Sequence, residues 1–226
     1  MIHTFPNLLF GDKMVTLMAA IVLVMQIAMV AQRWIVTNIR IYAAQSFLLA
    51  AIAGIVAFFN HAPHIYAAAV LTLLAKGILV PIGLERLVAR VGIRQEIEPI
   101  LNVPMSVLIS GGLTLVGYLV AESFNRPEET HVLGHNVLAV AISLFLIGFF
   151  MMVNRRKALT QVLALLSLEN GLFLAAISLT YGMPLVVELG VLFDVLVAVM
   201  VLGILVYRIR ESFESMDVSR LRRLRG

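Results

Sequence analysis

The sequence contains no cysteine and few charged residues, and both features restrict what the protein can do. Without a thiolate, the chain can form neither a disulfide nor a conventional iron–sulfur cluster site. Charged residues make up only 13% of the chain. The sequence also lacks a phosphate-binding glycine loop, a nucleophile elbow and a metal-binding helix motif. We therefore expect no cofactor, no bound metal and no catalytic residues of its own.

Apolar residues are what the chain has in excess. They account for 61% of the 226 residues, and the mean hydropathy is +1.00. Lipid offers no partners to the backbone, so apolar runs of about 18 or more residues indicate transmembrane helices. Seven such runs extend over Met14 to Gln32, Ile41 to Phe59, Ile65 to Leu87, Val103 to Ala121, Asn136 to Val153, Ala158 to Tyr181 and Pro184 to Tyr207. The sequence thus predicts an all-α membrane protein with seven transmembrane helices.

Basic residues indicate how the helices are oriented, because short loops rich in Lys and Arg stay in the cytoplasm. They gather in alternate breaks, at Arg33 and Arg40, at Arg86, Arg90 and Arg94, at Arg155, Arg156 and Lys157, and from Arg208 onward. The opposite breaks contain only Lys13 and Arg126. This bias predicts an outside N-terminus and a cytoplasmic C-terminus. It also explains the net charge of +4 without a nucleic-acid partner. For the basic tail over residues 209–226, contact with anionic lipid is favoured over docking to a cytoplasmic protein.

Three charged residues lie near the middle of apolar runs, namely Lys76, Glu169 and Asp194. Each costs about 2.5–3.5 kcal/mol to place at the centre of a bilayer, so intramembrane charge usually marks an ion or proton pathway. The alternative is a buried ion pair that only locks helices together. Glu188 is a weaker candidate, because it lies at the start of its run, where an ordinary interfacial carboxylate is expected.

Three further features concern helix shape and packing. Pro81 lies inside the third run, five residues after Lys76, and predicts a kink there. Gly111 and Gly112, with Ser110 and Gly117, give the fourth run a small face suited to close helix packing. Most of the other polar residues inside the runs are expected to form interhelical hydrogen bonds. They include Gln26, Gln45, Ser46, Thr72, Ser106, Ser110, Thr114, Ser143, Gln161, Ser167, Asn170 and Ser178.

Three segments near Glu169 carry a family resemblance. They are Leu144-Phe145-Leu146-Ile147-Gly148, Asn154-Arg155-Arg156-Lys157 and Leu165-Leu166-Ser167-Leu168-Glu169-Asn170. Together they resemble the K subunit of bacterial respiratory complex I, which is similar to the C subunit of Mrp-type sodium/proton antiporters. Both are three-helix proteins with a basic cytoplasmic loop, a mid-helix glutamate and a second carboxylate in the next helix. Glu169 matches the first carboxylate and Asp194 the second.

The whole chain, with four helices before this unit, resembles hydrogenase-4 component E of membrane-bound [NiFe] hydrogenase and formate hydrogenlyase complexes. The segment from Val186 to Asp194 is typical of that form. Two positions depart from the complex I subunit: Asp194 replaces a glutamate, and Asn170 replaces an apolar residue. The resemblance implies four N-terminal helices in residues 1–134, a K-like unit in residues 135–208 and a tail in residues 209–226.

The function implied by this resemblance is that of a non-catalytic subunit in the cytoplasmic membrane of a prokaryote. Its partners would be antiporter-like and complex I-like membrane subunits and a peripheral [NiFe] hydrogenase arm. Glu169 and Asp194 would be stations on a lateral proton path, with Lys76 as a charge partner or third station. Two alternatives are a subunit of a cation/proton antiporter without a redox partner, and a scaffold. A direct contact between Lys76 and a carboxylate that no water reaches would favour the scaffold, whereas polar residues and water continuing sideways from Glu169 into a partner would favour the path.

Overall fold

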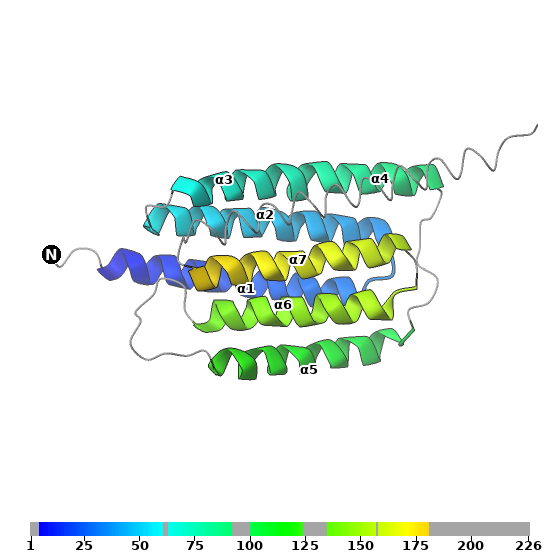
Figure 1. Cartoon of the computed structure of the whole chain (residues 1–226). Coiled ribbons are helices and arrows are strands. Elements are labelled where there is room, and N and C mark those ends of the chain that lie inside the picture. Colours follow the sequence, from blue (N-terminus) through cyan, green and yellow to red (C-terminus); the bar gives the residue numbers. More distant parts are fainter. Residues whose placement is uncertain (1–4, 61–62, 92–99, 124–134, 157, 181–226) are drawn as a thin grey trace, which may run out of the picture.

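The computed structural model describes residues 5–60, 63–91, 100–123, 135–156 and 158–180, and within these ranges every regular element is a helix. The helices are α1 (Phe5–Ala31), α2 (Ile35–Asn60), α3 (Pro63–Thr72), the π-helix η1 (Leu73–Leu79), α4 (Val80–Val91), α5 (Val103–Glu122), α6 (His135–Asn154) and α7 (Ala158–Thr180). They lie nearly parallel in one bundle, in which α3, η1 and α4 form a single continuous rod (Figure 1).

Six of the predicted spans coincide with helices of this bundle. Counting the rod once, six helices are long and apolar enough to cross a membrane, which describes a multi-pass membrane protein. The ends of α5, α6 and α7 agree with the predicted runs to within one residue. α1 and α2 instead begin before their predicted runs. The seventh run, Pro184 to Tyr207, lies outside the described residues, so the total of seven helices and the orientation stay predictions.

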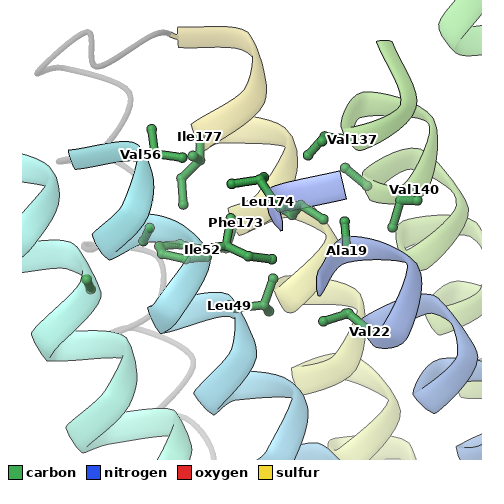
Figure 2. Packing of buried hydrophobic residues seen from close by; sticks show 14 of the residues in the cluster. Ala19, Val22, Leu49, Ile52, Val56, Val137, Val140, Phe173, Leu174 and Ile177 are labelled. Carbon is green, nitrogen blue, oxygen red and sulfur yellow. The ribbon is translucent and has the colours of Figure 1, made fainter. Parts of the chain in front are cut away.

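The two apolar clusters of the core lie between helices that are distant in sequence. Figure 2 shows the first cluster, which brings α1, α2, α3, α6 and α7 together. Its labelled residues are Ala19, Val22, Leu49, Ile52, Val56, Val137, Val140, Phe173, Leu174 and Ile177. The second cluster joins the other end of α1 to α2, α4, α6 and α7. α5 and the α3–α4 rod lie at opposite edges of the bundle (Figure 1).

Close packing of α5, α6 and α7 depends on glycines. A Cβ atom added at Gly148 would lie 2.7 Å from the Cα of Leu168, and one at Gly171 would lie 2.6 Å from the backbone nitrogen of Phe145. Gly117 of α5 is equally tight against Ser143 of α6. At Gly111 and Gly112 an added Cβ would meet no described atom within 4 Å, so close packing at these two positions stays a prediction.

The π-helix η1 lies just before Pro81, the residue at which the sequence predicted a kink. In an α-helix the N–H of residue 81 would bond to the carbonyl of Gly77, but proline has no N–H and its ring crowds that carbonyl. Here the chain adopts a wider helix just before the proline, and the N–H of Val80 donates to the carbonyl of Ala75, five residues earlier. Single π-helical turns of this kind are frequent at functional sites. Lys76 is the buried charged residue of η1.

Asn154, the last residue of α6, organises the start of α5. Its side-chain oxygen accepts from the N–H of Leu101 at 2.9 Å, and its amide nitrogen donates to the hydroxyl of Ser106 at 3.0 Å. The Asn154 carbonyl also accepts from the N–H of Ile100 at 3.1 Å. Asn102 then caps α5 by accepting from the N–H of Met105 at 3.2 Å.

Arg155 follows directly and closes the end of α1. Its guanidinium donates to the carbonyls of Met29, Val30 and Gln32 at 3.2–3.3 Å. The carbonyls of Met29 and Val30 lie in the last turn of α1, where they have no partner further along the helix and form the negative end of its dipole, and Gln32 directly follows the helix. Burial lowers the pKa of Arg155 to about 10, so the side chain stays charged at neutral pH.

Candidate functional site

Two of the predicted intramembrane charges meet in the middle of the bundle. The Nζ of Lys76, from η1, lies 3.6 Å from the Oε1 of Glu169, from α7. Both side chains are buried, with 3% and 1% of their surface exposed. The structure therefore brings Lys76 and Glu169 together as a buried ion pair, and the role of each residue in proton movement stays a prediction.

Phe173 forms one wall of this site. It lies one helical turn after Glu169 on α7, and Lys76 Nζ lies 5.7 Å from the centre of its ring. An ammonium over an aromatic face is attracted by the ring quadrupole, most strongly where water is excluded. The Lys76 ammonium is therefore held between a carboxylate and a ring, an arrangement that stabilises its charge away from water.

A second set of buried polar side chains links α1, α2 and α7. Gln45 of α2 donates to the side-chain oxygen of Gln26 of α1 at 3.0 Å and to the Val22 carbonyl at 3.1 Å. The hydroxyl of Ser167 of α7 donates to the same oxygen of Gln26. Ser167 lies two residues before Glu169. These contacts confirm that Gln26, Gln45 and Ser167 form interhelical hydrogen bonds.

Asn170 lies between the two sets of polar residues along α7. It follows Glu169 directly, and it lies three residues after Ser167, which places the two on neighbouring positions of the helix surface. Its side chain is 1% exposed. Neither its amide nitrogen nor its oxygen has a hydrogen-bond partner in the described part of the chain. The departure from the complex I pattern at this position thus places a carboxamide beside the buried glutamate.

The remaining predicted site residues are not tested by the structure. Asp194 and Glu188 lie outside the described residues, so their roles stay predictions. Among the described residues, no group of three or more His, Asp or Glu side chains could hold a metal ion. Sequence reasoning missed Asn38 and identified Arg155 only as a basic loop residue, although both side chains are buried near helix ends. Asn38 could have been found from its spacing to Gln45, because residues seven apart share one face of a helix.

Comparison with known proteins shows which proteins this chain is similar to. The sequence model of NADH-ubiquinone/plastoquinone oxidoreductase chain 4L matches residues 136–226, which include Glu169. The uncharacterized protein Rv0085 of Mycobacterium tuberculosis is 34% identical over 188 residues, which cover 83% of this chain and 84% of the relative.

Two enterobacterial relatives extend the similarity along nearly the whole chain. Hydrogenase-4 component E of Escherichia coli K12 and that of Shigella flexneri are each 24% identical over 216 residues, covering 96% of this chain and 99% of the relative. No solved structure gives a significant match. The chain therefore belongs to the same family as Rv0085, and it is a homologue of hydrogenase-4 component E whose C-terminal part carries a domain of the oxidoreductase chain 4L family.

Proposed function

We propose that this protein is a non-catalytic membrane subunit of a hydrogenase or complex I-like assembly, in which it conducts protons through Glu169. The similarity to a hydrogenase-4 component and to an oxidoreductase chain 4L family supports the assignment as a membrane subunit of such an assembly. The absence of cysteine from the sequence is consistent with redox chemistry carried out by other subunits.

The observation that carries the proton path is the buried pair of Lys76 and Glu169. An uncompensated charge is costly inside a membrane, and charged residues are retained there mainly on ion and proton pathways. Glu169 lies midway along α7 and within the region matched by the chain 4L family. A carboxylate that shares its surroundings with one ammonium can change protonation state when either charge moves.

The path would continue beyond this pair to other titratable groups. In our proposal Asp194 is the next station, on a seventh transmembrane helix, and Glu188 is a weaker candidate nearer the outer surface. The N-terminus would lie outside and the C-terminus in the cytoplasm of a prokaryotic cell, as the basic loops predict. The lateral neighbours would be antiporter-like and complex I-like subunits, with a peripheral [NiFe] hydrogenase arm on the cytoplasmic side.

One observation favours a scaffold as the second candidate function. Lys76 contacts Glu169 directly, as expected of a pair that only locks η1 against α7. The path is supported instead by the hydrogen bonds from Ser167 to Gln26 and from Gln45 to Gln26, which place further buried polar side chains close to Glu169 along α7. A cation/proton antiporter subunit without a redox partner would use the same residues, and its partners would distinguish it.

Purification from native membranes in a mild detergent, followed by mass spectrometry of the bound proteins, tests the assembly. We expect [NiFe] hydrogenase and antiporter-like subunits to co-purify. Antiporter-like subunits without a hydrogenase would support the antiporter alternative. A chain that is stable alone would contradict the proposed assembly.

The Glu169→Gln variant in the assembled complex tests the proton path. It removes the titratable group and keeps the size of the side chain. Coupled proton transport should be lost, whereas the exposed Glu85→Gln variant should keep it. Unchanged transport in a fully assembled Glu169→Gln complex would leave the scaffold as the better account.

A further inference from the structure

A line of buried polar side chains follows one face of α2 from its beginning to its middle. Asn38, Tyr42 and Gln45 are spaced by four and then three residues, which places them on one face of the helix. All three are at most 1% exposed. Their neighbours on the same helix, Ile39 and Leu49, are equally buried but apolar. The polar line is therefore a local feature of α2 within an apolar core.

The line begins at the end of the bundle where the basic residues gather. The amide nitrogen of Asn38 donates to the carbonyl of Gln32 at 3.4 Å, and Arg155 donates to the same carbonyl at 3.3 Å. Arg33 and Arg40 are exposed at this end. By the distribution of basic residues, this end is predicted to face the cytoplasm.

The line ends at α7, within two residues of Glu169 in the sequence. Gln45 donates to Gln26, and Ser167 donates to the same oxygen of Gln26. Ser167 lies one turn of α7 before Asn170, and Asn170 is adjacent to Glu169. Buried polar groups thus extend in sequence from the predicted cytoplasmic end of α2 to the surroundings of Glu169.

Four side-chain carboxamides along this line of polar residues have polar atoms that make no hydrogen bond within the described residues. In the described residues, no partner is found for the Oδ1 of Asn38, the Oε1 of Gln45, the Nε2 of Gln26 or either polar atom of Asn170. Buried polar groups in proteins are almost always paired, with protein or with ordered water.

Rotating the side-chain amides does not supply these partners. Both amide hydrogens of Gln45 are used, one by the Val22 carbonyl and one by Gln26. Turning this amide over would place its oxygen against both of those acceptors. Turning over Gln26 would place its NH₂ group against the donors of Gln45 and Ser167. The route therefore offers both donors and acceptors to another molecule, and water is the smallest one that provides both.

From this arrangement we propose that Asn38, Gln45, Gln26 and Asn170 bind a file of water molecules that connects the cytoplasmic end of α2 with Glu169. This inference rests on the proposed function, since the file would supply protons to Glu169. The four carboxamides are positioning residues, because they would hold water and do not titrate.

Single cysteines test this file directly, because the chain has no cysteine of its own. We would prepare Asn38→Cys, Gln45→Cys and Gln26→Cys, each in the intact complex in membrane vesicles. Their matched controls are Ile39→Cys, Leu49→Cys and Val22→Cys, which replace equally buried apolar residues of the same helices. The probe is silver ion, which reacts with hydrated thiols, and the readout is the modified fraction of this chain by intact mass.

We expect the three polar-site cysteines to react roughly tenfold or more faster than their controls, because thiols in apolar surroundings are inert. The reaction should occur in inside-out vesicles, which expose the cytoplasmic face. Equal rates for the two sets, or reaction only from the outer face, would overturn the inference. If one cysteine variant fails to assemble, the other two variants and their controls still test the water file.

The outcome can be separated from that of the proposed function. Reactive cysteines together with unchanged proton transport in Glu169→Gln would show a water file that carries no protons to Glu169, which contradicts the proposed function. Inert cysteines together with lost transport in Glu169→Gln would keep Glu169 in the path and overturn only the water file.

Discussion

Lys76 of η1 and Glu169 of α7 form a buried ion pair, with 3.6 Å between Nζ and Oε1. The pair connects the rod at the edge of the bundle with a helix at its centre (Figure 1). Taking two charges out of water is costly, and their attraction repays this cost only while both partners are present. The pair is therefore sensitive to the loss of one charge and much less sensitive to the loss of both.

Replacing Lys76 with methionine should destabilise the protein strongly. Lys76→Met leaves the Glu169 carboxylate buried without its ammonium, a change that typically costs about 3–5 kcal/mol. We expect a lower melting temperature of the purified complex and less of this chain in membranes. The double variant Lys76→Met with Glu169→Gln should recover most of the loss. Equal destabilisation of the single and double variants would contradict this explanation.

The ion pair of Arg40 and Glu85 provides a matched comparison. Its atoms are 3.3 Å apart, but the side chains are 75% and 41% exposed. Exposed pairs contribute about 0–1 kcal/mol, because water and salt screen them. We expect Arg40→Ala to change the melting temperature far less than Lys76→Met does. A similar loss in both variants would show that burial is not what makes the Lys76 pair important.

Gly148→Ala should weaken the contact between α6 and α7. The added Cβ would lie 2.7 Å from the backbone of Leu168, so one helix must move. Overpacking of this kind typically costs about 1–3 kcal/mol. The control is Gly112→Ala, which meets nothing within 4 Å and should stabilise α5 by about 0.5–1 kcal/mol. Melting temperatures that fall in both variants would argue against the tight contact at Gly148.

Removing Arg155 should loosen the end of α1. Arg155→Ala deletes three hydrogen bonds from a charged donor to the carbonyls of Met29, Val30 and Gln32, with an expected cost of about 1.5–3 kcal/mol. The exposed neighbour Arg156 is the control, because surface substitutions usually change stability by less than about 0.5 kcal/mol. Hydrogen exchange at the end of α1 would report the difference. Equal exchange in Arg155→Ala and Arg156→Ala would contradict the capping role.

The lowered pKa of Arg155 also predicts how the contribution of this residue to the free energy of unfolding depends on pH. Burial lowers the pKa from the ordinary value of an arginine to about 10, so the folded protein binds this proton less tightly than the unfolded chain does. Stability contributed through this group should therefore rise with pH only above about 10, and it should be constant between about pH 6 and 9. The difference in melting temperature between the wild type and Arg155→Ala should therefore be the same at every pH in that range.

The helices could be predicted from sequence because lipid demands long apolar runs. α5, α6 and α7 end where their runs end. α1 and α2 begin earlier because a helix continues beyond the apolar run when its polar residues, such as Asp12 and Arg40, can reach water. Hydropathy alone does not mark that part of a helix.

The pairing of helices could not be predicted in the same way. Lys76 and Glu169 were identified by their depth, but their contact depends on how η1 and α7 pack. Gly112 and Gly117 lie on one helix and look alike in sequence, yet only Gly117 contacts Ser143 of a neighbouring helix. The side chain that each residue meets is set by the rotation of whole helices, and single-helix patterns do not specify it.

The most direct measurement is the number of protons moved per electron transferred in vesicles that contain the assembled complex. It compares the wild type with Glu169→Gln and, as a control, with the exposed Glu85→Gln. We predict that Glu169→Gln lowers the ratio in the complexes that assemble and still transfer electrons, and that Glu85→Gln leaves it unchanged. An unchanged ratio in a fully assembled Glu169→Gln complex would contradict a proton path through Glu169.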